Sequence, residues 1–209
     1  MNAAQAPAAE LAPGLFRWSA PHPEWRPGGE AGGGSDWEPH VASAMFEAEG
    51  GVALFDPLLP GEGRERLLAW LDERIDGRPV GILTTIRWHA RDRAELAERY
   101  SANSSRAWNA VPAGVAPKPL RGAGEIVFWL PAARALVFGD RLIGAGGAVE
   151  LCPESWLEDE QVDRAGLAGL MLALTELPVE LLLVSHGEPV LRDGRAALAR
   201  AIRAAQQER

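Results

Sequence analysis

The stretch that decides the fold of this chain is Val179-Glu180-Leu181-Leu182-Leu183-Val184-Ser185-His186-Gly187-Glu188-Pro189. This apolar run, with Pro178 before it and Gly187 and Pro189 after it, predicts a buried, central strand of parallel type. His186 comes directly beyond the carboxyl end of that strand, where ligands of α/β sheets collect. Two interpretations of His186 stay open on this stretch alone. It belongs to a binding site, or it caps the strand and bonds a neighbouring loop.

The same order of elements occurs twice along the chain. Each half has a hairpin that ends in an aspartate, then a helix, a buried strand, a loop that carries a histidine, and a second helix. The expected elements are hairpins at 42–57 and 125–140, helices at 62–75, 93–100, 163–177 and 193–207, and strands at 80–85 and 179–184. Such self-similarity predicts two sheet-plus-helix halves that face each other. Both aspartates, Asp56 and Asp140, and both histidines, His89 and His186, should then lie at one edge.

Regions outside the repeat carry weaker signals. Residues 15–18 predict a first edge strand, and residues 101–119 predict only a short strand near 106–111 and an irregular crossing. Residues 21–39 are expected to form a long surface loop, which in a compact domain is often functional. For four side chains in or beside this region we favour a structural role, and the alternative is that they form the rim of a binding site. They are His22, Trp25, Trp37 and His40.

The amino-acid composition limits the classes of molecule that this chain is expected to bind. The chain has 209 residues, of which 47% are apolar and 24% charged, as in a globular protein with one large core. The formal net charge is −8, and Lys118 is the sole lysine. This balance argues against affinity for nucleic acid or for anionic membranes, and no apolar run is long enough for a membrane span. The expected partner is therefore a small molecule or a protein, and the oligomeric state stays open.

A single cysteine, Cys152, excludes an intrachain disulfide and a zinc cluster built on cysteine. Any metal would need histidine, aspartate or glutamate ligands. The N-terminus has neither the basic start nor the apolar segment of a signal peptide, so a reducing cytoplasm is the expected location. We expect a flexible tail at residues 1–13 and a single domain at residues 14–207.

Three motifs resemble those of the metallo-β-lactamase superfamily. Ala53-Leu54-Phe55-Asp56-Pro57-Leu58 is similar to its first strand-aspartate motif, Leu136-Val137-Phe138-Gly139-Asp140 to its metal-bridging aspartate motif, and Val184-Ser185-His186-Gly187-Glu188-Pro189 to its last histidine motif. The resemblance implies an α/β fold, a four-layer αββα sandwich of two similar halves with a zinc site between them. It also implies that Asp140 and His186 are metal ligands. We expect these two side chains to lie within a few ångströms of each other at the floor of a pocket.

The chain departs from the family where the main zinc motif should be. The family has His-x-His-x-Asp-His after a threonine, whereas this chain has Thr84-Thr85-Ile86-Arg87-Trp88-His89-Ala90-Arg91-Asp92-Arg93. No register rebuilds the motif, and the family's middle histidine is missing near residues 121–125. Arginines occupy several of the expected ligand positions, and cations there would repel a metal and favour an anion.

Two functions follow from this comparison. The first is a divergent, metal-free member with most of the zinc motif lost, which binds a small ligand such as an anion through Arg87, Trp88, Arg91, Arg121 and Glu125. The alternative is a hydrolase of a small ester, thioester, lactam or phosphoester that uses one zinc ion. Catalytic zinc needs about three protein ligands and a water. His89, Asp92, Asp140 and His186 are the candidate ligands and catalytic residues, so the expected cofactor is either none or one zinc.

Overall fold

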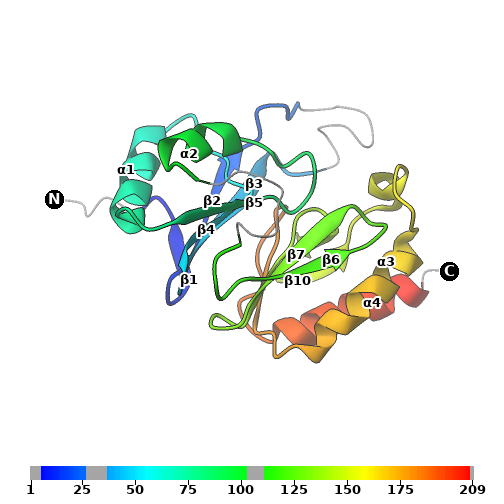
Figure 1. The fold of residues 1–209 in the computed structure, drawn as a ribbon. Coiled ribbons are helices and arrows are strands. Elements are labelled where there is room, and N and C mark those ends of the chain that lie inside the picture. The colour runs from blue at the N-terminus through cyan, green and yellow to red at the C-terminus, as the bar shows by residue number, and fades with distance from the viewer. Residues whose placement is uncertain (1–5, 27–36, 103–110, 208–209) are drawn as a thin grey trace.

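The structure is a computed structural model that describes residues 6–26, 37–102 and 111–207 (Figure 1). One sheet has five strands in the order β1-β2-β3-β4-β5, a second has four in the order β11-β8-β7-β6, and β9 and β10 form a two-stranded ribbon. The strands are β1 (Ala9–Ala12), β2 (Leu15–Pro21), β3 (His40–Ala48), β4 (Gly51–Phe55), β5 (Val80–Leu83), β6 (Ala116–Leu120), β7 (Glu125–Leu130), β8 (Ala135–Val137), β9 (Leu142–Ala145), β10 (Ala148–Leu151) and β11 (Leu181–Leu183).

The helices follow the pattern that the repeat predicts. They are α1 (Arg64–Ile75), α2 (Arg93–Arg99), α3 (Arg164–Met171) and α4 (Gly194–Gln207), with 3₁₀ turns at Glu154–Leu157 and Leu172–Glu176. The helix expected at 163–177 is therefore shorter than its apolar pattern, and its last part tightens into a 3₁₀ turn. It starts at Asp163, whose side chain accepts a hydrogen bond from the backbone N–H of Gly166.

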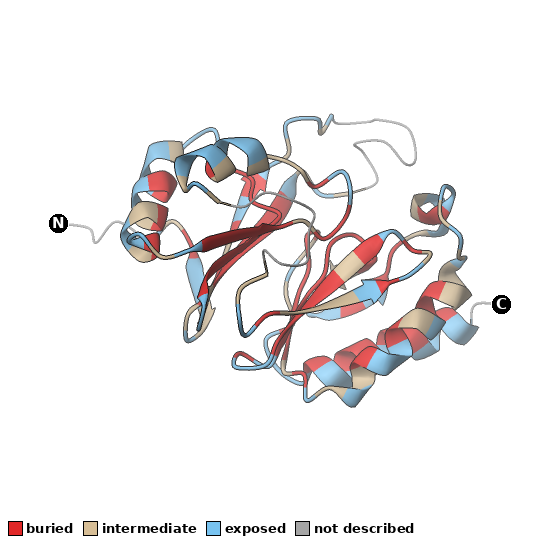
Figure 2. Cartoon of the chain, in the orientation of Figure 1, coloured by how far each residue is buried: buried red, intermediate tan, exposed pale blue. Residues whose placement is uncertain are grey.

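Three apolar clusters define the layers. Helices α1 and α2 pack Leu67, Leu71 and Leu96 on one face of the five-stranded sheet. Helices α3 and α4 pack on one face of the four-stranded sheet. The third cluster joins the opposite faces of the two sheets, with Phe55 and Phe128 at 5.4 Å between ring centroids. The order is thus helix, sheet, sheet, helix. Figure 2 shows strands such as β4 and β5 buried and the outer sides of the helices exposed.

The structure confirms the mixed α/β fold and corrects several details of it. Ala9–Ala12 pairs with β2, so part of the tail expected at residues 1–13 is a strand, and the strand after it is no edge. Strand β11 is parallel to β8, as predicted, but it ends its sheet and is not central. Strand β6 went unpredicted because Pro117 and Pro119 argue against a strand; prolines are tolerated there because β6 is an edge strand.

Two further expectations bear on the remaining segments. Residues 142–151 form the β9–β10 ribbon, which is not among the elements expected from the repeat. The short strand expected near 106–111 and much of the loop expected at 21–39 lie outside the described residues. In the part of the chain that the structure describes, no helix is both long enough and apolar enough to cross a membrane.

Candidate functional site

Strand ends from both halves deliver polar side chains to one edge of the two sheets. Asp56 follows β4 and Thr85 follows β5, while Asp140 follows β8 and His186 follows β11. All four are buried, with exposed fractions between 1% and 8%. Parallel pairing of β4 with β5 and of β8 with β11 explains this convergence, because the carboxyl ends of parallel strands meet at the same edge.

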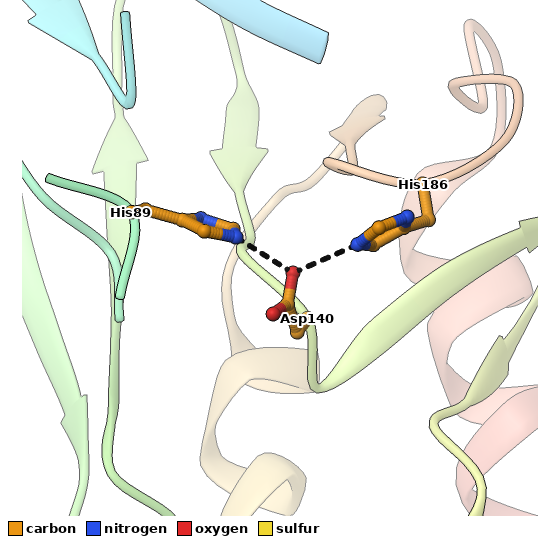
Figure 3. A group of neighbouring side chains, drawn as sticks. All are labelled: His89, Asp140 and His186. Atoms are coloured by element: carbon orange, nitrogen blue, oxygen red, sulfur yellow. Dashed lines mark ion pairs between the residues drawn. The ribbon is translucent and has the colours of Figure 1, made fainter. Parts of the chain in front are cut away.

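Two of these buried groups, Asp140 and His186, lie together with a third buried residue, His89, and both imidazoles face one carboxylate oxygen. Oδ1 of Asp140 lies 3.0 Å from Nε2 of His89 and 3.2 Å from Nε2 of His186. Figure 3 shows the two imidazoles pointing at Asp140 from opposite sides. The potential ligand atoms of His89, Asp140 and His186 all lie within 4.8 Å of one another. The expected closeness of Asp140 and His186 is confirmed, and the predicted shared edge of the two halves is present.

Asp56 orients His89 from behind. Its Oδ2 lies 2.9 Å from Nδ1 of His89, and its other oxygen accepts a hydrogen bond of 2.8 Å from the backbone N–H of Thr85. The Thr85 hydroxyl donates to the same carboxylate. A carboxylate on Nδ1 keeps the proton there and leaves Nε2 facing Asp140 with its lone pair available for a metal.

The two carboxylates also control the charge of His89 when no metal is bound. Burial lowers the pKa of His89, but the charges of Asp140 and Asp56 outweigh it and raise that pKa to about 9. Burial likewise raises the pKa of Asp140, yet the two imidazoles hold it well below its ordinary value. The metal-free group therefore contains an ionised Asp140 beside a protonated His89.

The backbone and second oxygen of Asp140 are held by separate partners. Oδ2 accepts a hydrogen bond of 2.6 Å from Nε1 of Trp88. The carboxylate of Glu125 accepts three backbone N–H groups, those of Gly139 (3.1 Å), Asp140 (2.8 Å) and Arg141 (2.9 Å). Burial, which outweighs these hydrogen bonds, raises the pKa of Glu125 to about 7. Asp140 is thus left with one oxygen, Oδ1, directed at the histidines.

His186 is held between two tryptophans. Its ring meets Trp37 edge to face at 5.0 Å and Trp156 at 5.2 Å between centroids. The backbone of its loop bridges to β3 at Val41, so His186 is tied to the five-stranded sheet as well as to its own. The turn after it needs glycine, because Gly187 has a φ of 77° and a Cβ there would lie 2.5 Å from a backbone oxygen of Gly144.

The side chain of Arg91 forms hydrogen bonds with residues of both halves of the molecule. Nη1 donates to the carbonyl oxygens of Ala42 (2.9 Å) and Asp56 (2.8 Å), and Nη2 donates to the hydroxyl of Ser185 (2.8 Å). Its buried position lowers its pKa, with the nearby carboxylates opposing that shift. Arg91 therefore ties the loop that carries His89 to the residue before His186.

Behind the site, Arg141 is a second buried arginine, with no exposed surface. Its guanidinium donates to the carbonyl oxygens of Ala123 (2.7 Å) and Trp156 (2.6 Å) and to Oε1 of Glu160 (2.7 Å). Glu160 also pairs with the exposed Arg87 at 3.1 Å. This network anchors the loop that carries Trp156 beside His186.

A cavity of about 610 Å³ opens over the His–Asp–His group. His89, Asp140 and His186 line it together with side chains of the 22–41 region, of the loop 87–91 and of the loop 155–160. Three tryptophans contribute to its walls: Trp37, Trp88 and Trp156. The rim of a binding site considered for the 21–39 loop is present at His22 and Trp37, while Trp25 lines a neighbouring cavity.

Several residues predicted for the site lie elsewhere. Asp92 is absent from the His–Asp–His group, because its Oδ2 accepts a hydrogen bond of 2.7 Å from the backbone N–H of Leu59. Arg121 is exposed and does not line the cavity, and Glu125 lies beneath it with its carboxylate bound to backbone. Arg87, Trp88 and Arg91 do line the cavity. The expectation that most of the zinc motif is lost is therefore too strong, because three ligand-type groups still converge.

Three contributors to the site were not predicted: Arg141, Glu160 and Trp156. Asp56 was predicted to lie at the edge of the site but not as one of its ligand-type residues. A signal existed for Asp56, since the repeat placed it at the same edge as Asp140. Nothing local marks Arg141 or Glu160, whose roles depend on contacts between distant segments.

The donor set fits a zinc ion. Two imidazole nitrogens and one carboxylate oxygen are ligands that zinc commonly takes, and three protein ligands are typical of catalytic sites. Oδ1 of Asp140 is buried and faces the Nε2 atoms of both histidines, as expected of an atom placed for a cation. The carboxylate of Asp56 behind His89 is the supporting contact that metal-bound histidines usually have.

Replacement of Asp56 by asparagine is expected to lower zinc affinity about 10- to 100-fold. The amide would direct an N–H group at Nδ1 of His89, which then carries its proton on Nε2, the atom meant for the metal. Zinc titration against a competing chelator measures the change. Asp76→Asn is a matched control, because Asp76 also has a left-handed backbone, with φ of 41° against 45° for Asp56. Asp76 is exposed at the C-terminal end of α1. Equal affinities for the two variants would contradict the orienting role.

Comparisons with known proteins agree with this geometry. No family model and no curated protein matches the sequence. Solved structures do match: a metallo-β-lactamase from Erythrobacter litoralis at 18% identity and TM-score 0.62, covering 96% of this chain and 92% of that one. Another is DIM-1 metallo-β-lactamase exposed to ceftazidime, at 13% identity and TM-score 0.62, covering 97% of both chains. A third, from Pontibacter korlensis, has 14% identity and TM-score 0.58, covering 96% and 99%. Over the 96–97% of the chain that these matches cover, therefore, the chain has the metallo-β-lactamase fold.

Proposed function

We propose that this protein is a hydrolase that uses a single zinc ion held by His89, Asp140 and His186. The observation that carries the proposal is the convergence of two Nε2 atoms on Oδ1 of Asp140, at 3.0 and 3.2 Å, on the floor of a large cavity. A zinc ion bound there would supply Lewis acidity and a water whose pKa is lowered towards about 7. Esters, thioesters, lactams and phosphoesters are the candidate substrates.

The residues of the chain have separate tasks in this proposal. Asp56 keeps the Nδ1 proton of His89 in place, and Trp88 holds one oxygen of Asp140 so that the other faces the metal position. Trp37 and Trp156 fix the plane of the His186 ring. Because these partners orient the ligands before a metal binds, little reorganisation is needed on binding.

A single metal suits this site better than a pair. Among the described residues, His89, Asp140 and His186 form the one group whose ligand atoms lie close enough together. Asp92, the remaining candidate, bonds backbone instead, and the guanidinium of Arg91 brings positive charge to the cavity wall. A second cation beside Arg91 would meet repulsion.

Elemental analysis of protein purified without chelators tests the proposal. We expect close to one zinc per chain, and an increase in the melting temperature when zinc is added back to stripped protein. Zinc binding to the folded state alone raises the free energy of unfolding by roughly 2.7 kcal/mol at a free zinc concentration 100 times the dissociation constant. Asp92→Asn should bind zinc as the wild type does, which separates the present ligand set from one that includes Asp92.

Zinc-loaded protein should then hydrolyse at least one member of a panel of esters, thioesters, lactams and phosphoesters. Protein that takes up no zinc even after zinc is added would refute the hydrolase. The metal-free binding protein that the sequence favoured would then be the better account.

A further inference from the structure

The large cavity is lined by more negative than positive side chains. Its acidic residues are Glu24, Asp140, Glu158, Asp159 and Glu160, and its basic residues, apart from histidines, are Arg87 and Arg91. The formal balance is therefore five against two, or five against three when the protonated His89 of the metal-free protein is included. This excess is the opposite of what the arginine-rich loop predicts from sequence, which is a site for an anion.

Both arginines already have partners. Arg91 donates to two carbonyl oxygens and the Ser185 hydroxyl. Arg87 pairs with Glu160 at 3.1 Å and lies over the ring of Trp88 at 4.7 Å. An anionic ligand would have to replace these contacts while it approached the carboxylates of the cavity, so neither arginine is placed to bind one.

Three of the carboxylates lie at the exposed mouth of the cavity. No described residue forms an ion pair or side-chain hydrogen bond with the carboxylate of Glu24, Glu158 or Asp159. Like charges gathered at the mouth of a concave site raise the local concentration of cations. The net charge of −8 of the whole chain acts in the same direction.

The walls beside these carboxylates are aromatic. Trp37 and Trp156 line the cavity and both contact the His186 ring, so their indoles lie next to the group that would hold the metal. Indole faces attract ammonium and guanidinium groups, and quaternary ammonium ligands are bound in this way.

We propose that this cavity selects substrates that carry a cationic group, an ammonium or quaternary ammonium, bound against Trp37 and Trp156 and close to Glu24, Glu158 and Asp159. The inference rests on the proposed function, because it names the substrate class of the same site. The scissile bond would lie over His89, Asp140 and His186, with the cationic group towards the mouth of the cavity.

Three small probes of matched shape test the proposal without any need for catalysis. Choline is cationic, 3,3-dimethylbutan-1-ol is its uncharged isostere, and 3,3-dimethylbutanoate is an anion of similar size. Calorimetric titration at fixed ionic strength should show choline binding roughly 5- to 30-fold more tightly than the alcohol. The anion should bind most weakly. Equal binding of choline and the alcohol, tighter binding of the anion, or no binding of choline would overturn the proposal.

Paired variants locate the binding site. Glu158→Gln with Asp159→Asn should reduce the preference for choline over the alcohol by roughly two- to tenfold. Glu62→Gln with Glu65→Gln removes the same charge from exposed positions at the start of α1, outside the cavity, and should leave the preference unchanged. An equal loss in both double variants would show that the preference comes from net charge alone and would refute the cavity as its origin.

Zinc content measured on the same samples keeps the two proposals apart. Protein that holds zinc but binds 3,3-dimethylbutanoate best is a hydrolase of a different substrate class. Protein that holds no zinc but prefers choline retains the cationic site without the proposed chemistry.

Discussion

Replacement of Asp140 by alanine is expected to abolish the proposed zinc binding and, with it, the proposed hydrolysis. Asp140 is the centre of the group, since its Oδ1 lies 3.0 Å from one imidazole and 3.2 Å from the other. The variant keeps two histidines, fewer than the three protein ligands of catalytic zinc sites. The loss in affinity should exceed the about 10- to 100-fold that removal of a supporting carboxylate costs.

Zinc content and zinc affinity of purified Asp140→Ala measure this effect. Asp159→Ala is the matched control, because it removes an exposed carboxylate from the wall of the same cavity. It should bind zinc as the wild type does. An Asp140→Ala variant that holds zinc normally would show that the metal, if any, binds elsewhere.

The pKa of His89 in the metal-free protein provides an independent test of the role of Asp140. In the wild type, His89 should titrate near pH 9, because the charges of Asp140 and Asp56 outweigh its burial. Because the pKa of His89 is higher in the folded state than its ordinary value of 6.5, protonation of His89 stabilises the fold. This contribution to the free energy of unfolding is complete below pH 6.5 and is lost as the pH rises through about 9. Without Asp140 the pKa of His89 should fall, since burial is opposed by Asp56 alone, and this pH dependence of stability should weaken. NMR titration and urea unfolding across this range measure both.

Replacement of Arg141 by methionine is expected to destabilise the fold by about 3–5 kcal/mol, the usual result of removing one partner from a buried charged pair. Arg141 has no exposed surface, and its guanidinium serves two carbonyl oxygens and Glu160. Methionine fills similar space but donates no hydrogen bond. The carbonyl groups of Ala123 and Trp156 would lose this donor. The carboxylate of Glu160, with 9% of its side chain exposed, would keep only the exposed Arg87 of its two arginine partners.

Arg87→Met provides the comparison for this variant. Arg87 pairs with the same carboxylate, but 54% of its side chain is exposed, and exposed ion pairs contribute only about 0–1 kcal/mol. Urea unfolding monitored by circular dichroism gives both free energies. Similar losses for the two variants would show that the hydrogen bonds of Arg141 to Ala123 and Trp156 add little to the fold.

The edge of the sheets where the site lies could be predicted from the sequence because the signals are local. Apolar runs that end in Asp56, Asp140 and His186 identify strands and their carboxyl ends, and their repetition places these ends together. Strands β6 and β1 escaped prediction for an equally physical reason. They lie at or near sheet edges, where pairing compensates for prolines and for a weak apolar pattern.

The exclusion of Asp92 from the ligand-type group and the charge of the cavity depended on tertiary structure. By itself, the sequence determined that Asp140 and His186 share one edge with His89, because strand length and apolar pattern are encoded residue by residue. Beyond a strand end, however, the backbone of a loop decides where each side chain points. Arg91 has φ of 39°, a left-handed turn after which Asp92 bonds Leu59 instead of joining His89. Contacts between distant segments, not the local pattern of arginines, therefore occupy hydrogen-bond donors of Arg87 and Arg91, and acidic side chains outnumber these two arginines in the cavity.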